Sequence, residues 1–494
     1  MKNQGLPPSP LHRPSIHESG YRHASGQARY VDDWPLPPGT GHGWVVTSPH
    51  AHARIVARDA SEAQARPGVR AVLFADAIPG SRHIGPIVHD EELLATEFVH
   101  YVGQPVALIV ADDLTSARDA AAAVAVEYEP LAAVHSIDEA IEQDSYIGEP
   151  HVIARGDVDA VLDAASVRVT GEVRTGAQDH FYLETQAALV LPEEDGNFTV
   201  LSSTQHPTEI QREVATVLGV GAHRVVCEVP RMGGGFGGKE SQATPFACLA
   251  ALGAWSTGRP TKVWLNREAD MRITGKRHPV LGHYDAAFDE QGQLLGMRAE
   301  IWSDGGFSAD LSLPVLDRAL FHLDNAYFVP ALHFVGRACR TNHASNTAFR
   351  GFGGPQGMVV VEEVLNRAAE RLGLDPAQVR ARNFYGPTPR DRAPYGQEIR
   401  YEHNRLSRVH TELMASSDYE ARRASIEQHN ASSPWVKRGV GYQPVKFGIS
   451  FTKAILNQAG AFVLIYSDGT VQLNHGGTEM GQGLHTKMRA VCAH

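Results

Sequence analysis

Stretches with the two-residue spacing of strands alternate with stretches of helical spacing along most of the chain, a pattern typical of a mixed α/β protein. Short aliphatic runs predict strands at 44–47, 71–74 and 105–110. Asp113 then begins an alanine-rich helix, and the strand pattern returns at 124–128. We expect these elements to form one compact α/β unit.

A second and larger α/β region begins near residue 156. One helix is predicted to start with Pro207 in its first turn and to end by Gly219, and another is capped by Thr244 and closes near Gly258. The further elements expected are strands around 261–265 and 280–302, a helix from Met358 to about Leu372, a charged helical stretch at 404–429, and strands at 461–466 and 470–474.

These patterns divide the chain into an arm, a first domain and a larger region. The arm (1–40) is rich in Pro, Gly and His, and residues 136–155 are interpreted as a linker region. We see no repeat of fixed period and no low-complexity tract. The first α/β domain is predicted at 41–145, and the larger region begins near 156.

Three glycine-rich loops carry the chemistry that the sequence suggests. They span residues 231–240, 346–357 and 475–483. Glycines remove side chains from the backbone, so that N–H groups can approach a large, anionic or oxo-rich ligand. The first loop follows a β-branched run and precedes a predicted helix, whose N-terminus would favour negative charge. Three such loops in one chain suggest one extended ligand that is held from several sides.

Two common nucleotide motifs fit the first loop only in part. Gly233, Gly235 and Gly238 match the spacing of a dinucleotide fingerprint, but the acidic residue expected about 20 positions later is missing. Most of a P-loop is also present, but Glu240 stands where a Ser or Thr should hold magnesium. A nucleotide-binding α/β protein therefore stays open only as a weak alternative.

Composition narrows the classes of protein. The net charge of −11 argues against nucleic acid and anionic membranes as partners, and no apolar run approaches the roughly 18 residues of a membrane span. No secretory signal is visible, so a cytoplasmic location is expected. The four cysteines are widely separated and form no Cys-x-x-Cys pair, which argues against a zinc site or an iron–sulfur cluster built by this chain alone.

Taken in order, the three loops resemble the molybdenum-cofactor subunit of xanthine dehydrogenase. The resemblance runs from about His17 to the last residue and is closest to the bacterial type with separate subunits. It implies an α/β hammerhead for residues 41–145, followed by a multi-subdomain molybdopterin-binding region whose first part is 156–400 and whose second part begins at 401. The segments that look like family signatures are 231–240, 318–322, 345–357, 446–451, 456–460 and 476–487.

The resemblance also implies roles for single residues. Glu240 and Arg318 resemble the polar pair that grips the purine and acts in catalysis: the guanidinium would stabilise negative charge on the ring, and the carboxyl would orient the substrate. Phe352 resembles one of two phenylalanines that stack on the flat substrate. The residues that resemble cofactor contacts are Gln205, Phe236, Gly237, Arg350, Gly481 and Gln482, of which Gln205, Phe236 and Arg350 would lie near molybdenum without being strong ligands.

The implied partner is a separate subunit that carries [2Fe-2S] and FAD centres, with NAD as the expected final acceptor. The absence of cysteine clusters agrees with that division. The implied reaction is hydroxylation of hypoxanthine and xanthine to urate. An aldehyde oxidase-like hydroxylase is the rival within the superfamily, but its members usually lack both the glutamate at position 240 and the arginine at position 318.

Family members continue beyond the position of His494. We therefore expect this chain to be truncated, and we expect the general-base glutamate and the second stacking phenylalanine to lie outside it. An inactive remnant that only binds the partner subunit stays open as a further alternative.

Overall fold

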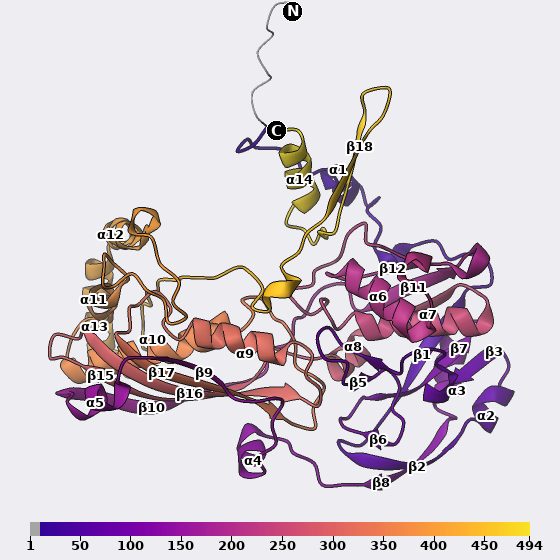
Figure 1. Ribbon diagram of the computed structural model, residues 1–494, viewed down its shortest axis with the longest axis horizontal. Coiled ribbons are helices and arrows are strands. Elements are labelled where there is room, and N and C mark those ends of the chain that lie inside the picture. Colours follow the sequence, from indigo (N-terminus) through magenta and orange to yellow (C-terminus); the bar gives the residue numbers. More distant parts are fainter. Residues whose placement is uncertain (1–9) are drawn as a thin grey trace, which may run out of the picture.

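Two large sheets organise the computed structural model, which describes residues 10–494 (Figure 1). A seven-stranded sheet underlies one lobe, and a five-stranded sheet underlies the other. Part of the predicted N-terminal arm forms the short helix α1 (Gly20–Ala24), and its first nine residues lie outside the described ones.

The seven-stranded sheet joins strands from two of the predicted domains. Its β1 pairs in parallel with β14 and antiparallel with β7, so that the first α/β domain and the larger domain share one sheet. The division between them at 145–156 stays a prediction. In spatial order the strands are β13 (Val225–Glu228), β12 (Phe198–Ser202), β11 (Ala187–Pro192), β14 (Thr261–Trp264), β1 (Gly41–Thr47), β7 (Pro105–Ala111) and β3 (Val69–Leu73).

Two helices pack on this sheet where the sequence predicted them. α6 (Pro207–Leu218) ends at Gly219 in the left-handed conformation, and α7 (Thr244–Thr257) ends in the same way at Gly258. α7 is apolar on all sides and lies in the core, because it is enclosed between α6 and the sheet. A β-carbon at Gly253 would come within 2.8 Å of the Thr261 side chain, so this glycine lets α7 approach β14 closely.

The remaining elements of the first α/β domain lie at the end of that sheet formed by β1, β7 and β3. A three-stranded sheet pairs β2 (Ala53–Asp59) with β6 (Phe98–Val99) and β8 (Ala125–Pro130). The alanine-rich helix α3 (Leu114–Ala121) begins after Asp113, where the sequence predicted a helix start, and the Asp113 side chain caps it by accepting a hydrogen bond from the Ser116 N–H. The shorter elements are α2 (Ser61–Ala65), β4 (His83–Ile84) and β5 (Glu91–Glu92).

The five-stranded sheet is covered on one face by α9 (Ser312–Phe321) and α10 (Gly354–Leu372), which contact each other (Figure 1). The predicted linker at 136–155 was wrong, because that stretch contains α4 (Ile137–Glu142) and the edge strand β9. The helix α5 (Val158–Asp163) follows. In spatial order the strands are β10 (Val167–Thr175), β15 (Val280–Phe288), β16 (Leu294–Gly306), β17 (Ala331–Arg340) and β9 (His151–Arg155).

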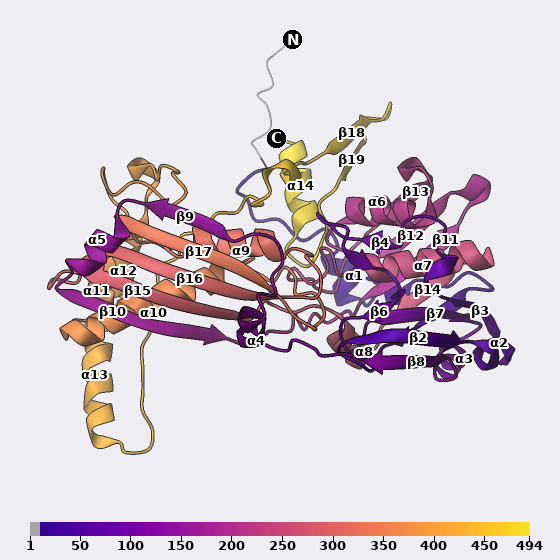
Figure 2. The same ribbon diagram turned by 60° about the horizontal axis from the view of Figure 1, so that its bottom comes forward.

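The last part of the chain crosses between the lobes. The predicted charged helix is two helices, and α13 projects away from the body (Figure 2). The hairpin β18–β19 and α14 stand above the junction of the two lobes. No helix among the described residues has both the length and the apolar character needed to cross a bilayer. The elements of this last part are α12 (Leu406–Ser416), α13 (Tyr419–Ser432), β18 (Ala461–Ile465), β19 (Val471–His475) and α14 (Leu484–Cys492). Two further helices, α8 (Arg267–Ile273) and α11 (Pro376–Asn383), come earlier in the chain.

Candidate functional site

The three glycine-rich loops, far apart in the sequence, meet around one cavity of about 500 Å³. Eight of the nine residues singled out from the sequence line it, and only Arg318 does not. The lining residues are Gln205, Gly235, Phe236, Gly237, Glu240, Ala348, Phe349, Arg350, Gly351, Phe352, Met480, Gly481 and Gln482.

Gln205 is locked to the backbone of the first loop. Its Oε1 accepts hydrogen bonds from the N–H groups of Gly237, at 2.8 Å, and Lys239, at 3.3 Å. The backbone N–H of Gln205 donates to the Lys239 carbonyl at 2.7 Å. A β-carbon at Gly235 would lie 2.5 Å from the same Oε1, so a side chain there would displace the amide. This glycine is therefore required for the close packing of Gln205 on the loop.

The first and second loops are joined directly. The Arg350 N–H donates to the Phe236 carbonyl at 2.8 Å. Gly237 has a φ of +97°, and a β-carbon on it would lie 2.6 Å from the Ala348 carbonyl oxygen. His180 also contacts this junction, because its Nε2 lies 2.7 Å from the Ala348 carbonyl oxygen. The two loops therefore form one continuous wall of the cavity.

A buried ion pair fixes the base of the first loop, and sequence reasoning missed it. The Lys239 ammonium donates to the Glu184 carbonyl at 2.7 Å and to the Ser203 hydroxyl at 2.6 Å. The Glu184 carboxylate lies 3.6 Å from that ammonium and accepts from the Gly233 N–H at 2.8 Å. Burial lowers the pKa of Lys239 to about 8, against the attraction of Glu184. The only sequence signal was a lysine beside so many glycines.

The sequence suggested that the glycines of the first loop lie at a helix N-terminus, but the structure does not place them there. α7 begins at Thr244, after a run of turns that follows Gly238. The loop therefore lacks the aligned dipoles of a helix end, and the N–H groups of Gly233, Gly237 and Lys239 are already bound by side chains of the protein.

Glu240 is the titratable group of the cavity wall. Burial, with smaller contributions from the nearby carboxylates of Glu209 and Asp310, raises its pKa to about 7 against the opposing effect of His206. Near neutral pH, Glu240 can therefore either donate a proton in a hydrogen bond or accept one. Such a group can pair with the edge of a heterocycle in either protonation state.

Arg318 is the predicted site residue that the structure keeps out of the cavity. It is 4% exposed, and its guanidinium lies over the rings of Phe352, at 5.7 Å, and Phe447, at 5.2 Å. Its Nη2 donates to the Ser450 carbonyl, and its Nε has no hydrogen-bond partner among the described residues. Glu240 and Arg318 do not face one cavity here, because the segment 446–451 covers the guanidinium.

A phenylalanine that sequence reasoning did not assign lies beside Phe352. The ring centroid of Phe451 is 5.1 Å from that of Phe352, with the two planes tilted by 56°. The expectation that the second stacking phenylalanine lies outside this chain stays a prediction, and Phe451 is a candidate for that role within it. It belongs to the signature at 446–451, which was the signal that could have identified it.

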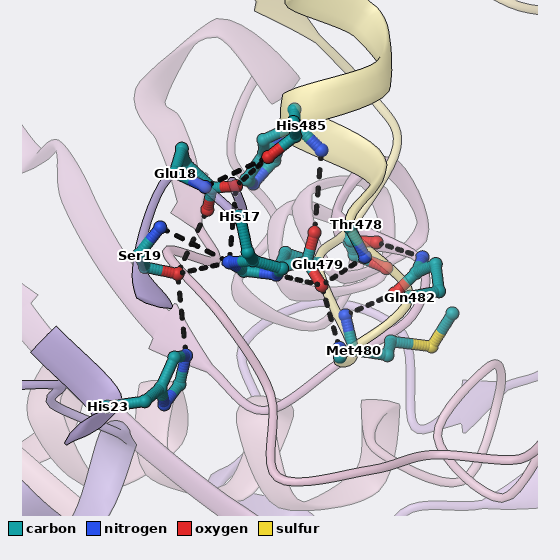
Figure 3. Close-up of polar contacts among 12 residues, drawn as sticks. His17, Glu18, Ser19, His23, Thr478, Glu479, Met480, Gln482 and His485 are labelled. Atoms are coloured by element: carbon teal, nitrogen blue, oxygen red, sulfur yellow. Dashed lines mark hydrogen bonds and ion pairs between the residues drawn. The ribbon is translucent and has the colours of Figure 1, made fainter. Parts of the chain in front are cut away.

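The third loop is shaped by Glu479 (Figure 3). Its carboxylate accepts from the N–H of Gly481, at 2.7 Å, and of Gly483, at 3.1 Å. The Gln482 side chain turns back and donates to the Thr478 carbonyl at 2.9 Å. A ligand that accepted a hydrogen bond from the Gly481 amide would therefore have to share it with Glu479.

Three family models match this chain. A model of the molybdopterin cofactor-binding domain matches residues 142–384, and a second model with that description matches 412–494. The a/b hammerhead domain of aldehyde oxidase and xanthine dehydrogenase matches residues 25–132. The predicted fold class, with a hammerhead followed by a molybdopterin-binding region, is confirmed.

Named relatives are similar over nearly the whole chain. Xanthine dehydrogenase of Dictyostelium discoideum is 42% identical over 484 residues, which are 98% of this chain and 35% of that protein. Xanthine dehydrogenase/oxidase of Gallus gallus is 45% identical over 97% of this chain and 35% of its own length. Nicotinate hydroxylase hnxS of Emericella nidulans is 43% identical over 97% and 36%. The chain thus spans about a third of the length of these relatives.

Solved structures share the fold. Quinoline 2-oxidoreductase from Pseudomonas putida 86 superposes with a TM-score of 0.85 at 26% identity, over 97% of this chain and 64% of that one. Aldehyde oxidoreductase from Desulfovibrio gigas gives a TM-score of 0.80 at 28% identity, over 92% of this chain and 51% of that one.

Proposed function

We propose that this chain is the molybdenum-cofactor part of a xanthine dehydrogenase. The chain belongs to the xanthine dehydrogenase and aldehyde oxidase family of molybdopterin-binding proteins. The proposed reaction hydroxylates hypoxanthine and xanthine to urate. Electrons would pass to [2Fe-2S] and FAD centres on a partner subunit and then to NAD. The meeting of three glycine-rich loops around one cavity is the observation that carries the proposal.

The cavity wall fits a large, oxygen-rich cofactor. Side chains at Gly235 and Gly237 would collide with Gln205 and with the Ala348 carbonyl, so the wall stays flat only with glycine at both positions. The nearby Gln205 amide offers a hydrogen-bonding group beside this surface. When bound, the molybdenum cofactor supplies the two-electron oxidation and oxygen transfer that side chains cannot perform.

We assign the residues of this chain to two tasks. Glu240 would hold the heterocycle by its edge, because its pKa near 7 allows it to donate or accept a hydrogen bond. Phe352 would offer a ring face for stacking. The residues that would hold the cofactor are Gln205, Phe236, Gly237, Arg350, Gly481 and Gln482, of which Gln205, Phe236 and Arg350 would lie closest to molybdenum.

Arg318 and Phe451 would complete the purine pocket after a local movement. The Phe352 and Phe451 rings are too close for a flat ligand to fit between them, since two stacked layers would need about 7 Å. A shift of segment 446–451 would part these rings. It would also free Arg318 from the Ser450 carbonyl, so that its guanidinium could stabilise charge on the substrate.

Substrate preference tests the assignment in the complete enzyme. We expect Glu240→Ala or Arg318→Met to lower kcat/KM for a purine at least about tenfold more than for an aldehyde, because an aldehyde makes no use of the polar pair. Glu228→Ala, at an exposed position of β13, serves as the control and should leave both rates unchanged. Equal losses on both substrates would favour the aldehyde oxidase-like alternative.

The purified wild-type protein gives the broader test. Molybdenum and pterin found together would support the proposal, whereas their absence from the complete enzyme would favour a remnant that only binds its partner. A bound nucleotide would favour the weak third alternative.

A nitrogen heterocycle other than a purine is a second candidate substrate. The observation that favours it is the position of Arg318, which leaves Glu240 as the only charged side chain of the predicted pair in the cavity. A relative at 43% identity is named a nicotinate hydroxylase. Turnover of nicotinate faster than xanthine would select this candidate.

A further inference from the structure

The buried carboxylate of Glu479 organises the whole third loop. The residue is 1% exposed, and its two oxygens accept from the N–H groups of Gly481 at 2.7 Å, Gly483 at 3.1 Å and His485 at 3.4 Å (Figure 3). Burial alone would raise the pKa of Glu479, but these hydrogen bonds bring it below the usual value. One ionised side chain therefore holds three amides of the segment that leads from Met480 into α14.

The same residue connects the third loop to the first. The Met232 N–H donates to the Glu479 carbonyl at 2.8 Å. Met232 is buried and directly precedes Gly233, whose own N–H is held by Glu184. The position of Gly481 and Gln482 against the cavity therefore depends on Glu479 through both its side chain and its backbone.

The N-terminal arm reaches across the molecule to this residue. The His17 ring lies with Nε2 3.4 Å from Glu479 Oε1. The Ser19 N–H lies 3.2 Å from His17 Nδ1 and donates to it, so that Nε2 carries the proton that points to Glu479. The assignment of this tautomer follows from the hydrogen bonds. His17 thus adds a fourth donor to the carboxylate.

A second contact fastens the arm to α14. The Glu18 N–H donates to the Thr486 hydroxyl at 2.9 Å, and that hydroxyl donates back to the Glu18 carboxylate at 2.6 Å. His17 also packs beside Gly483, where its Cδ2 would lie 3.6 Å from an added β-carbon. The arm therefore contacts both Glu479, the side chain that shapes the third loop, and α14, the helix that follows this loop.

We propose that Glu479 is the positioning residue of the cofactor-binding third loop, and that His17 and Glu18 of the N-terminal arm hold it in place. The inference rests on the proposed function, because it assigns the loop to the pterin. Neither arm residue lines the cavity. Their effect on the cofactor would pass through the carboxylate and the backbone amides that it binds.

A divalent cation is the alternative reading of the same cluster. His17, Glu18 and Glu479 offer ligand atoms within 4.8 Å of one another. Hydrogen bonds already account for each side chain, however. His17 receives the Ser19 N–H, Glu18 receives the Thr486 hydroxyl, and Glu479 receives three backbone amides. We therefore interpret the cluster as a clamp that needs no ion.

Hydrogen exchange of the full chain tests the clamp without any cofactor. Exchange of the amides at 481–485 should rise at least about tenfold in Glu479→Gln and roughly 2- to 10-fold in His17→Ala, since one charged acceptor or one donor is lost. Tyr21→Ala, on the same arm but 75% exposed, is the matched control and should leave these amides unchanged. Unchanged exchange in Glu479→Gln would overturn the proposal.

Pterin retention in the complete enzyme tests the consequence. Both variants should release pterin faster than wild type, and the double variant should release it no faster than Glu479→Gln alone, because His17 acts through Glu479. Additive effects would overturn this coupling. If EDTA speeds exchange and release in wild type as much as His17→Ala does, a metal ion and not the hydrogen bonds holds the arm. A wild-type enzyme without pterin would refute the proposed function while leaving the exchange result valid.

Discussion

The first and third glycine-rich loops line the same cavity but are held in opposite ways. The first is built into the body of the protein: Gly235, Gly237 and Lys239 are buried, and the second loop packs directly on it. The third lies mostly at the surface, where Gly481 and Gln482 are exposed and one carboxylate shapes the backbone. The comparison teaches that a ligand-facing glycine loop can be fixed by dense packing or by a single buried acceptor.

The two loops also use glycine for different reasons. Gly237 and Gly481 have nearly the same positive φ, +97° and +102°. A β-carbon at Gly237 would meet the Ala348 carbonyl, whereas one at Gly481 would meet nothing within 4 Å. At Gly237 both conformation and space require glycine, and at Gly481 conformation alone does.

Among the changes to the first loop, removal of the buried Lys239 ammonium should cause the largest loss in the free energy of unfolding. Lys239→Met would leave the Glu184 carboxylate, 9% exposed, without its ionic partner, so we expect the free energy of unfolding to fall by about 3–5 kcal/mol. Urea-induced unfolding measures this change. Lys487→Met, at an exposed position of α14, should change it by less than about 0.5 kcal/mol. A similar small value for both variants would show that the ion pair does not stabilise the loop.

The paired glycines separate packing from conformation. We expect Gly237→Ala to cost about 2–4 kcal/mol, from the strained φ together with the collision at Ala348, and Gly481→Ala to cost about 1–2 kcal/mol from the φ alone. Thermal and urea unfolding of the two variants give the comparison. Equal losses would mean that the contact between the first and second loops can relax at little cost.

The pH dependence of Glu240 gives the last test. Its folded pKa is raised from 4.5 to about 7. Between these values the unfolded chain has lost the proton and the folded chain keeps it, so ionisation destabilises the fold increasingly as pH rises to about 7. Glu240→Gln cannot ionise, and its stability relative to wild type should increase by about 3 kcal/mol from pH 4 to pH 8.

Unfolding midpoints at these two pH values measure that difference. Glu228→Gln, on the exposed side of β13, should show no such change and controls for loss of a carboxylate as such. A difference that falls with pH for Glu240→Gln would mean that this carboxyl is stabilised in its ionised form.

The sequence predicted the elements with local signals. α6 and α7 were placed correctly because Pro207, Gly219 and Gly258 mark their ends by backbone chemistry that needs no tertiary contact. The predicted Thr244 cap was wrong: Ala243 is the N-cap of α7, and the Thr244 hydroxyl donates to Glu209 at 3.1 Å instead. The edge strand β9 was missed because its side chains alternate only between half-buried and exposed, which leaves a weak pattern.

The sequence predicted the residues that line the cavity but not the residues that hold its loops in place. Motif position identified Gln205 and Glu240, which the structure brings to one cavity, but gave no role to Lys239 or Glu479. Those two act through residues distant in sequence, as when Lys239 reaches Glu184 or Glu479 reaches His17. Arg318 shows the same limit, because its burial depends on the path of segment 446–451.

The contact between α9 and α10 links Arg318, on α9, to Phe352, which comes just before α10. β-carbons at Gly353 and Gly357 would lie 2.0 Å from the carbonyl oxygens of Val315 and Ala319, so the two backbones touch with no side chain between them. Arg318 and Phe352 are thus carried by one rigid unit. The segment 446–451, which contacts both residues from outside this helix pair, could therefore be exchanged or moved while α9 and α10 keep their places.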